Sequence, residues 1–177
     1  MRRIFIAICL LFCSVLAYGA GATYTVGSKG DYATINAAYT AHSGEDNVTL
    51  DLAAETITET SAITIVAGVD NWTISGTGID ATTVLLESPN SSVIWWQGAS
   101  PTLTDLTIVT GSGAPNVGYM RVQGEPFTCT NVRFRRPSGG ATSYLVRVNS
   151  EVSTYTDCKF ESLSTSIASL YLNEDGS

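Results

Sequence analysis

Aromatic, basic and amide residues that could bind a ligand recur along the chain at a nearly constant spacing. Trp95, Arg121 and Arg147 follow one another at equal intervals, and Tyr171 follows at a slightly shorter one. Amides stand two positions after each of them, at Gln97, Gln123, Asn149 and Asn173. Aromatic rings stack on the apolar faces of sugar rings, while guanidinium and amide groups bind hydroxyls and uronate carboxylates. The spacing therefore predicts a strip that binds polysaccharide, acidic polysaccharide included; we call these residues the outer strip.

An alternative interpretation of the outer strip is purely structural. Glu125, Glu151 or solvent would neutralise the two arginines, and the aromatic rings would only cover the sheet beneath them. Glu125, Glu151 and Asp175 also form an acidic column, which could collect Ca²⁺. Because no further acids cluster around these three residues, the column is interpreted as solvated. No cofactor is expected, with Ca²⁺ as the alternative.

A basic patch lies in the second half of this acidic chain. Its members are Arg133, Arg135, Arg136 and Lys159. Such a patch is usually a solvated edge, and an acidic glycan is the alternative partner.

The sequence offers no recognisable catalytic constellation. His42 is the only histidine, so no Ser/His/Asp triad can use more than this one residue, and it is expected to interact with the C-terminal end of a helix. There is no C-x-x-C pair and no phosphate-binding loop. No catalytic residue and no metal ligand are therefore assigned.

Composition limits the class of protein. The chain has 177 residues, of which 44% are hydrophobic and 14% are charged, and its net charge is −7. These values are typical of one globular domain and exclude a disordered chain or a coiled coil. The negative charge disfavours binding to nucleic acid or to an anionic membrane.

The segment 1–22 is interpreted as a secretory signal peptide. Two arginines precede an apolar run over residues 4–17, which is too short to span a bilayer and is followed by small residues. Cleavage is expected between Gly19 and Ala22. Residues 23–177 would then form one exported domain with no membrane span, which is secreted, periplasmic or held at the cell surface.

Two sequence columns repeat with the same constant step that separates Trp95 from Arg121. The first contains Thr104–Ile108, Thr130–Phe134 and Thr156–Phe160; the second contains Ile94–Gln97, Met120–Gln123 and Val146–Asn149, with Leu170–Asn173 following after a slightly shorter step. Upstream, Asn71–Ile74 is matched to the first column and Ile63–Val66 to the second, with longer steps to the next members of these columns. Residues 76–80 are expected to form a longer turn that absorbs the extra length. Thr82–Leu86 is expected to be an added strand in that turn. Short alternating strands without intervening helices keep such columns aligned when each coil stacks in register on the previous one. The predicted fold class is all-β, a parallel β-solenoid.

The inward positions of this solenoid are expected to form four apolar columns. They are Ile94/Met120/Val146/Leu170, Trp96/Val122/Val148/Leu172, Leu106/Val132/Cys158 and Ile108/Phe134/Phe160. Cys129 is predicted to align with Leu103 and Tyr155. Because Cys129 and Cys158 are then about three residues apart in register, two separate thiols are favoured over a disulfide.

The two ends of the solenoid are expected to differ. Asp31 is predicted to cap a short helix from Tyr32 to His42, which ends at Gly44 and covers the open first coil. No comparable cap follows Leu170. The domain is therefore expected to be truncated at its C-terminal end, or covered there by another chain or by further residues.

Three segments resemble the right-handed parallel β-helix proteins of the pectin lyase-like superfamily, and in particular the N-terminal part of pectinesterases. Gly30–Ala38 resembles the opening G-D-[YF]-x-T-I-x-x-A, and Trp72–Thr82 and Leu145–Val148 with Cys158–Phe160 resemble later segments. The resemblance covers most of residues 23–170. It implies a right-handed solenoid that acts on or binds uronate polymers.

The catalytic residues of pectinesterases are not matched. The position of the glutamine that stabilises the anion is Thr142, and that of the general-acid aspartate is Thr165. A threonine cannot protonate a leaving group as a carboxylic acid does. The nucleophilic aspartate and the closing arginine would lie beyond Ser177.

Three functions remain open at this point. The favoured one is an exported module that binds polysaccharide through the outer strip and lacks a complete active site. One alternative is the N-terminal part of a carbohydrate-active enzyme, a lyase or esterase on uronate polymers. The other is a structural or adhesive stalk.

Overall fold

The computed structural model describes most of the predicted domain. The described residues are 21–65, 71–87, 94–96, 100–110, 120–123, 126–136, 146–149, 152–162 and 170–172. The predicted signal peptide lies almost wholly outside them. Within the described ranges, no helix is long and apolar enough to cross a membrane.

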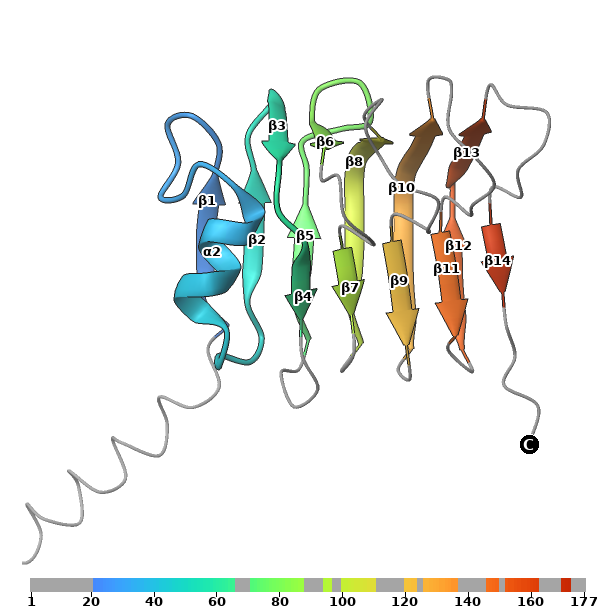
Figure 1. Ribbon diagram of the computed structural model, residues 1–177, viewed down its shortest axis with the longest axis horizontal. Helices are drawn as coiled ribbons and strands as arrows, with labels where there is room; N and C mark the ends of the chain where they lie inside the picture. Colours follow the sequence, from blue (N-terminus) through green and yellow to red (C-terminus); the bar gives the residue numbers. More distant parts are fainter. Residues whose placement is uncertain are drawn as a thin grey trace, which may run out of the picture.

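The described chain consists of short strands and one helix, arranged as a stack of coils (Figure 1). In chain order the elements are β1 (Thr23–Val26), α2 (Ile35–His42), β2 (Thr49–Leu52), β3 (Thr56–Glu59), β4 (Ile63–Ile65), β5 (Thr73–Ser75), β6 (Thr83–Leu86), β7 (Ile94–Trp96), β8 (Thr102–Thr110), β9 (Met120–Gln123), β10 (Phe127–Arg136), β11 (Val146–Asn149), β12 (Ser153–Thr156), β13 (Lys159–Ser162) and β14 (Leu170–Leu172).

The strands form three faces of a parallel β-solenoid. The first face contains β1, β2, β5, the first halves of β8 and β10, and β12; the second contains β3, β6, the second halves of β8 and β10, and β13; the third contains β4, β7, β9, β11 and β14. All pairs between the named strands are parallel. The predicted fold class is therefore confirmed.

The register of the last coils follows the repeat in the sequence. On the third face Met120 is opposite Ile94 and Val146 is opposite Met120, as the constant step predicts. On the second face Phe134 is opposite Ile108 and Phe160 is opposite Phe134, with the same step. The two repeating columns thus lie on two different faces.

One match between the sequence columns is wrong. Asn71–Ile74 does not continue the column of Thr104–Ile108, because Thr73 pairs with Thr102 on the first face. The reason is that the solenoid has two kinds of corner with an Asn or Asp residue, and the sequence pattern does not separate them.

These corners hold residues with left-handed backbone angles. Asn47 and Asn71 have φ values of 57° and 59° just before β2 and β5, while Asp105, Asn131 and Asp157 have values of 52–56° where the first face turns into the second. The corner residues stack across coils: Asn71 Nδ2 donates to Asn47 Oδ1 at 3.0 Å, and Asn131 Nδ2 donates to Asp105 Oδ1 at 2.6 Å. Asn and Asp tolerate this conformation better than other residues with a side chain.

The extra residues upstream form a loop where the first face turns into the second. The step from Thr73 to Thr83 is longer than the step between their partners, Thr102 and Thr107. Inside the loop Thr82 Oγ1 accepts from Thr77 N and donates to the carbonyl of Ala53, at 3.0 Å in each case. The loop therefore absorbs the longer step, as predicted. The expectation of an added strand at Thr82–Leu86 is wrong, because β6 pairs with β3 and with the second half of β8 and is the regular second-face strand of its coil.

The core lies between the three faces and is mainly apolar, although Glu59 and Arg136 are also buried. All described members of the four predicted inward columns are buried, apart from Cys158 and Phe160 in the last coil, which are partly buried. The side chains at positions 96, 170 and 172 lie outside the description. Cys129 is opposite Tyr155, and the thiols of Cys129 and Cys158 are not bonded to each other, as predicted.

The helix begins later than the sequence predicted. Its N-cap is Thr34, whose Oγ1 accepts from Ala37 N at 3.1 Å, and not Asp31. The Asp31 carboxylate instead accepts from the amide and hydroxyl of Thr25 at 2.9 and 2.8 Å, which holds residues 31 and 32 against β1. The helix buries Ile35, Ala38 and Tyr39 against the first coil, so it covers that end as expected.

A buried charge in an inward column should abolish folding. Val148 is 1% exposed, and Val148→Asp would place an unpaired carboxylate in the continuous core at a cost of several kcal/mol. Total stabilities of single domains are about 5–15 kcal/mol. Circular dichroism melting of Val148→Asp should show no cooperative transition, while Asn149→Asp, on the adjacent outward position, should melt like the parent. A folded Val148→Asp protein would contradict this core.

The corner residues should contribute by conformation as well as by hydrogen bonding. Asn131→Ala loses the hydrogen bond to Asp105 and strains the backbone, so the free energy of unfolding should fall by about 2 kcal/mol. Asn131→Gly loses only the hydrogen bond, and the loss should be about 1 kcal/mol. Urea denaturation of both variants measures the difference. Equal losses for Ala and Gly would mean that the left-handed angle carries no strain.

Candidate functional site

The third face brings the outer strip together along one line. Trp95 is opposite Arg121, Arg121 is opposite Arg147, and Arg147 is opposite Tyr171 in the register of β7, β9, β11 and β14. Residues far apart in the sequence thus occupy neighbouring strands, which stand about 4.8 Å apart.

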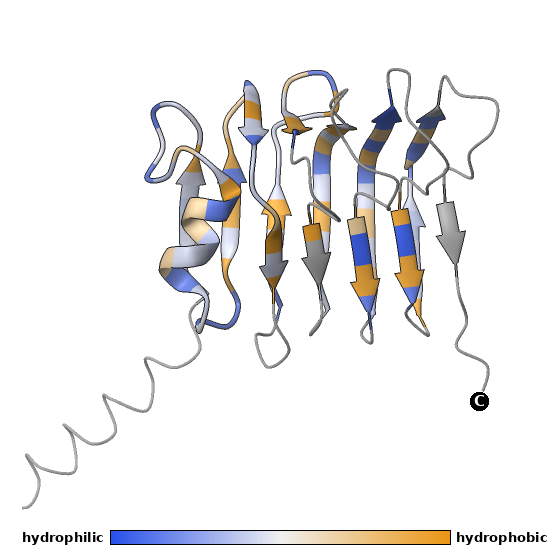
Figure 2. Ribbon diagram, in the orientation of Figure 1, coloured by the Kyte–Doolittle hydropathy of each residue, from blue (hydrophilic) through white to orange (hydrophobic). Residues whose placement is uncertain are grey.

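The two arginines of the outer strip are partly buried and lie between inward residues. Met120 and Val122 flank Arg121 and are buried, so the Arg121 side chain leaves the core on the opposite side of the sheet. The same alternation places Arg147 outward on β11. Figure 2 shows a hydrophilic band on each of the neighbouring strands β9 and β11, between hydrophobic ones. Arg121 and Arg147 are opposite each other in the register of these two strands.

The amides of the strip continue the same alignment. Gln123 is opposite Asn149, and Asn149 Oδ1 accepts a hydrogen bond of 3.1 Å from Arg147 Nε. This bond fixes the plane of the Arg147 guanidinium along its own strand. Both arginines also make contacts within the protein, so the strip is partly organised before any ligand binds.

Several predicted residues lie outside the described part of the chain. They are Gln97, Asn173, Glu125, Glu151, Asp175, Thr142 and Thr165, together with the side chains of Trp95 and Tyr171. The acidic column, interpreted as solvated with Ca²⁺ as the alternative, thus lies outside the described residues. Among the described residues no group of three or more His, Cys, Asp or Glu side chains is placed to hold a metal ion.

Two arginines that are opposite each other on neighbouring strands suit a specific chemistry. Each guanidinium can donate two parallel hydrogen bonds to a carboxylate, and two of them in line favour an anion that reduces their mutual repulsion. Neutral hydroxyls can accept from the same groups. The described outer strip therefore suits a hydroxyl-rich ligand with regularly spaced anionic groups.

The basic patch is on the second face and is paired with acids. Arg133 Nη1 lies 2.8 Å from Asp80 Oδ1, and Arg133 Nε lies 3.5 Å from Glu161 Oε1. Arg135 Nε lies 3.9 Å from the other oxygen of Glu161, and Arg136 is buried. Because Arg133 and Arg135 are paired with acids of the same chain, the basic patch presents less positive charge to a ligand. This favours its interpretation as a solvated edge over a site for an acidic glycan.

The structure shows a cluster at the helix that sequence reasoning missed. The His42 ring stacks on Tyr24 with centroids 3.7 Å apart. Its Nδ1 lies 2.8 Å from Glu45 Oε1, and its Nε2 lies 2.6 Å from the hydroxyl of Tyr32. Because a carboxylate only accepts, Nδ1 donates to Glu45, and in the neutral ring Nε2 accepts from Tyr32. The Tyr24 hydroxyl also donates to Glu45, at 3.0 Å.

This cluster ties the C-terminal end of the helix to β1. The hydrogen bonds from His42 and Tyr24 lower the pKa of Glu45 and so keep it ionised. Partial desolvation, with the hydrogen bond to Glu45, raises the pKa of Tyr24. The only available signal in the sequence was a single histidine close to tyrosines and acids, with no periodic spacing. The arrangement explains how the cap is held.

A buried carboxylate joins the helix to the second face. Glu59 on β3 is 1% exposed, and its two oxygens accept from the amides of Ile35 and Asn36 in the first turn of α2. Burial raises the pKa of Glu59 to about 7, although the two amide hydrogen bonds oppose this change. Glu59 thus holds the cap in place, although the removal of its carboxylate from water is unfavourable.

None of the family models, curated protein sequences or solved structures compared with the chain matches it.

The stability of the protein should depend on pH through Glu59. The pKa of Glu59 in the folded state is above its ordinary value of 4.5, so the folded state binds the proton more tightly. The contribution of this group is complete below pH 4.5 and is lost as the pH rises to about 7, by up to about 3 kcal/mol.

Chemical denaturation between pH 4 and about 8 measures this effect. Glu59→Gln stays neutral at every pH and should remove most of this decline. Glu87→Gln, at an exposed position just after β6, should leave the decline unchanged. An identical pH profile for Glu59→Gln and the parent would exclude Glu59 as its source.

Proposed function

We propose that this protein is an exported module that binds an acidic polysaccharide along the outer strip, without a complete active site of its own. The single observation that carries the proposal is the in-register pairing of Arg121 with Arg147 on the outward side of the third face. Trp95 and Tyr171 follow in the same register on the two flanking strands. This order of aromatic, cationic and aromatic positions suits an extended chain of sugars.

The geometry of a solenoid supports a polymer as the ligand. Each coil repeats the outward positions at one strand spacing, so the strip offers similar binding groups in a row. A polymer that contacts several of them gains affinity because the later contacts are intramolecular. A single sugar on the same surface would contact only one or two rows and bind weakly.

The assignment of the solenoid to a family, and of the protein to a compartment, rests on sequence motifs. We infer a right-handed solenoid of the pectin lyase-like kind from Gly30–Ala38 and Trp72–Thr82. Export, and a place outside the cell or in the periplasm, is inferred from the apolar segment at the start of the chain. A uronate polymer is the corresponding substrate class, and it suits two adjacent arginines.

Removal of one guanidinium from the outer strip should weaken binding without unfolding the protein. Arg147→Ala loses a charge-assisted, two-pronged contact, so the affinity for polygalacturonate should fall about tenfold. The melting temperature should change little, because Arg147 is outward and only partly buried. Calorimetric titration of residues 23–177 measures the affinity.

The control is Arg135→Ala on the second face, which removes an arginine that is 52% exposed and should leave the affinity unchanged. Equal binding by Arg147→Ala and the parent would reject the outer strip. Release of unsaturated or de-esterified products would favour an enzyme, and the absence of both binding and products would favour a stalk.

A further inference from the structure

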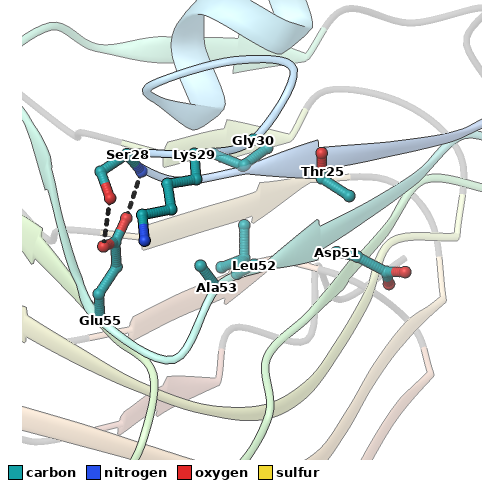
Figure 3. A pocket seen from close by; sticks show the side chains of 9 residues that line it. Thr25, Ser28, Lys29, Gly30, Asp51, Leu52, Ala53 and Glu55 are labelled. Atoms are coloured by element: carbon teal, nitrogen blue, oxygen red, sulfur yellow. Dashed lines mark hydrogen bonds between the residues drawn. The ribbon is translucent and has the colours of Figure 1, made fainter.

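A pocket of about 460 Å³ lies at the end of the solenoid that α2 covers, away from the outer strip. The loop from Gly27 to Gly30 forms one wall, and the end of β2 with the turn that follows it forms the other. Figure 3 shows Ser28, Lys29 and Glu55 on one side and Thr25 and Asp51 on the other. The volume is within the range of small-molecule sites.

The wall formed by the loop is fixed before any ligand binds. Gly27 has a φ of 146°, and a Cβ there would stand 2.6 Å from Glu55 Oε1, so only glycine fits. Gly27 N donates to the carbonyl of Tyr32 at 2.8 Å, and Gly30 N donates to the carbonyl of Gly27 at 3.1 Å. The pocket is therefore preformed, which lowers the entropic cost of binding.

The opposite wall is tied to this loop by one carboxylate. Glu55 accepts hydrogen bonds from both the amide and the hydroxyl of Ser28, the latter at 2.8 Å. These bonds, reinforced by the charge of Lys29, lower the pKa of Glu55 and keep it ionised. The tie closes one side of the pocket and holds the neighbouring Lys29 at its rim.

The remaining polar groups of the pocket are free to bind a ligand. In the described part of the chain, neither the Lys29 ammonium nor the Asp51 carboxylate makes a hydrogen bond or an ion pair within 4.0 Å, although the charge of Lys29 acts on Glu55 at longer range. Ala53, which is partly buried, supplies a small apolar surface between them, next to Leu52 of the core. A donor, an acceptor and an apolar surface match the hydroxyls and the CH face of a sugar ring.

The charge of the pocket selects among such ligands. Asp51 and Glu55 outweigh Lys29 by one negative charge, and Asp31 stands behind Thr25 with its pKa lowered by hydrogen bonds from that residue. An anionic sugar would meet net repulsion. A cationic sugar would be attracted by the net charge, but its ammonium would be repelled by Lys29, one of the two groups between which the ligand lies. A neutral sugar can accept from Lys29 and donate to Asp51 without either cost.

We propose that this pocket is a second saccharide site, which binds one neutral sugar unit between Lys29 and Asp51 and against Ala53. The site differs from the outer strip in place, charge and ligand. It does not depend on the strip, so either proposal can fail while the other stands.

Titration with small glycosides tests the pocket directly. Methyl β-galactopyranoside and methyl α-glucopyranoside are the neutral probes, and glucuronate and glucosamine are the charged ones. Amide resonances of residues 28, 29 and 53 should shift with at least one neutral probe, with a Kd on the order of 1 mM. Asp51→Ala and Lys29→Met should each weaken this binding about tenfold.

Matched controls separate the pocket from the rest of the molecule. Glu87→Gln and Lys159→Met remove an exposed acid and an exposed base elsewhere, and Arg147→Ala alters the outer strip; all three should leave the glycoside shifts unchanged. No shift of the pocket amides with either neutral probe at about 100 mM would overturn the proposal. Tighter binding of glucuronate or glucosamine would overturn the choice of a neutral ligand.

Discussion

The structure depends on the parallel, in-register stacking of each coil on the previous one. Every named strand pair joins two successive coils, as Ile63 pairs with Ile94 and Thr49 with Thr73, so no coil is stable without its neighbour. A slip by one residue would turn every inward side chain outward. The inward columns therefore have to remain apolar in every coil, and they fix the direction of the outward residues between them.

The end of such a stack needs a different solution, because its apolar cross-section has no neighbouring coil. Here α2 covers it with Ile35 and Tyr39, and Trp72 packs edge-on to Tyr39 with centroids 5.3 Å apart. The Trp72 indole also donates to the carbonyl of Glu45 at 2.8 Å, so the second coil helps to hold the cap. A short helix has little stability of its own, and these side-chain contacts supply what it lacks.

The sequence was sufficient to predict the fold because the stacking is periodic. The constant step predicted the partners of Met120 and Phe134 directly, and with them the line of the outer strip. The step could not predict features that occur once. Thr34 was missed as the N-cap because Asp31 is an equally good capping residue, and only the bridge between Tyr32 and Val26 excludes it. The pairing of Glu59 with the helix amides is a long-range contact that no pattern announces.

The same distinction separates the two proposed binding surfaces. Where the repeat is regular, outward residues such as Arg121 and Arg147 form rows that suit a repeating ligand. Where the chain departs from the repeat, between β1 and the helix, the backbone is free to form a loop that encloses a pocket for one unit. The stacking constraint thus accounts for both surfaces: the periodic coils fix the row, and the loop that precedes the cap fixes the pocket.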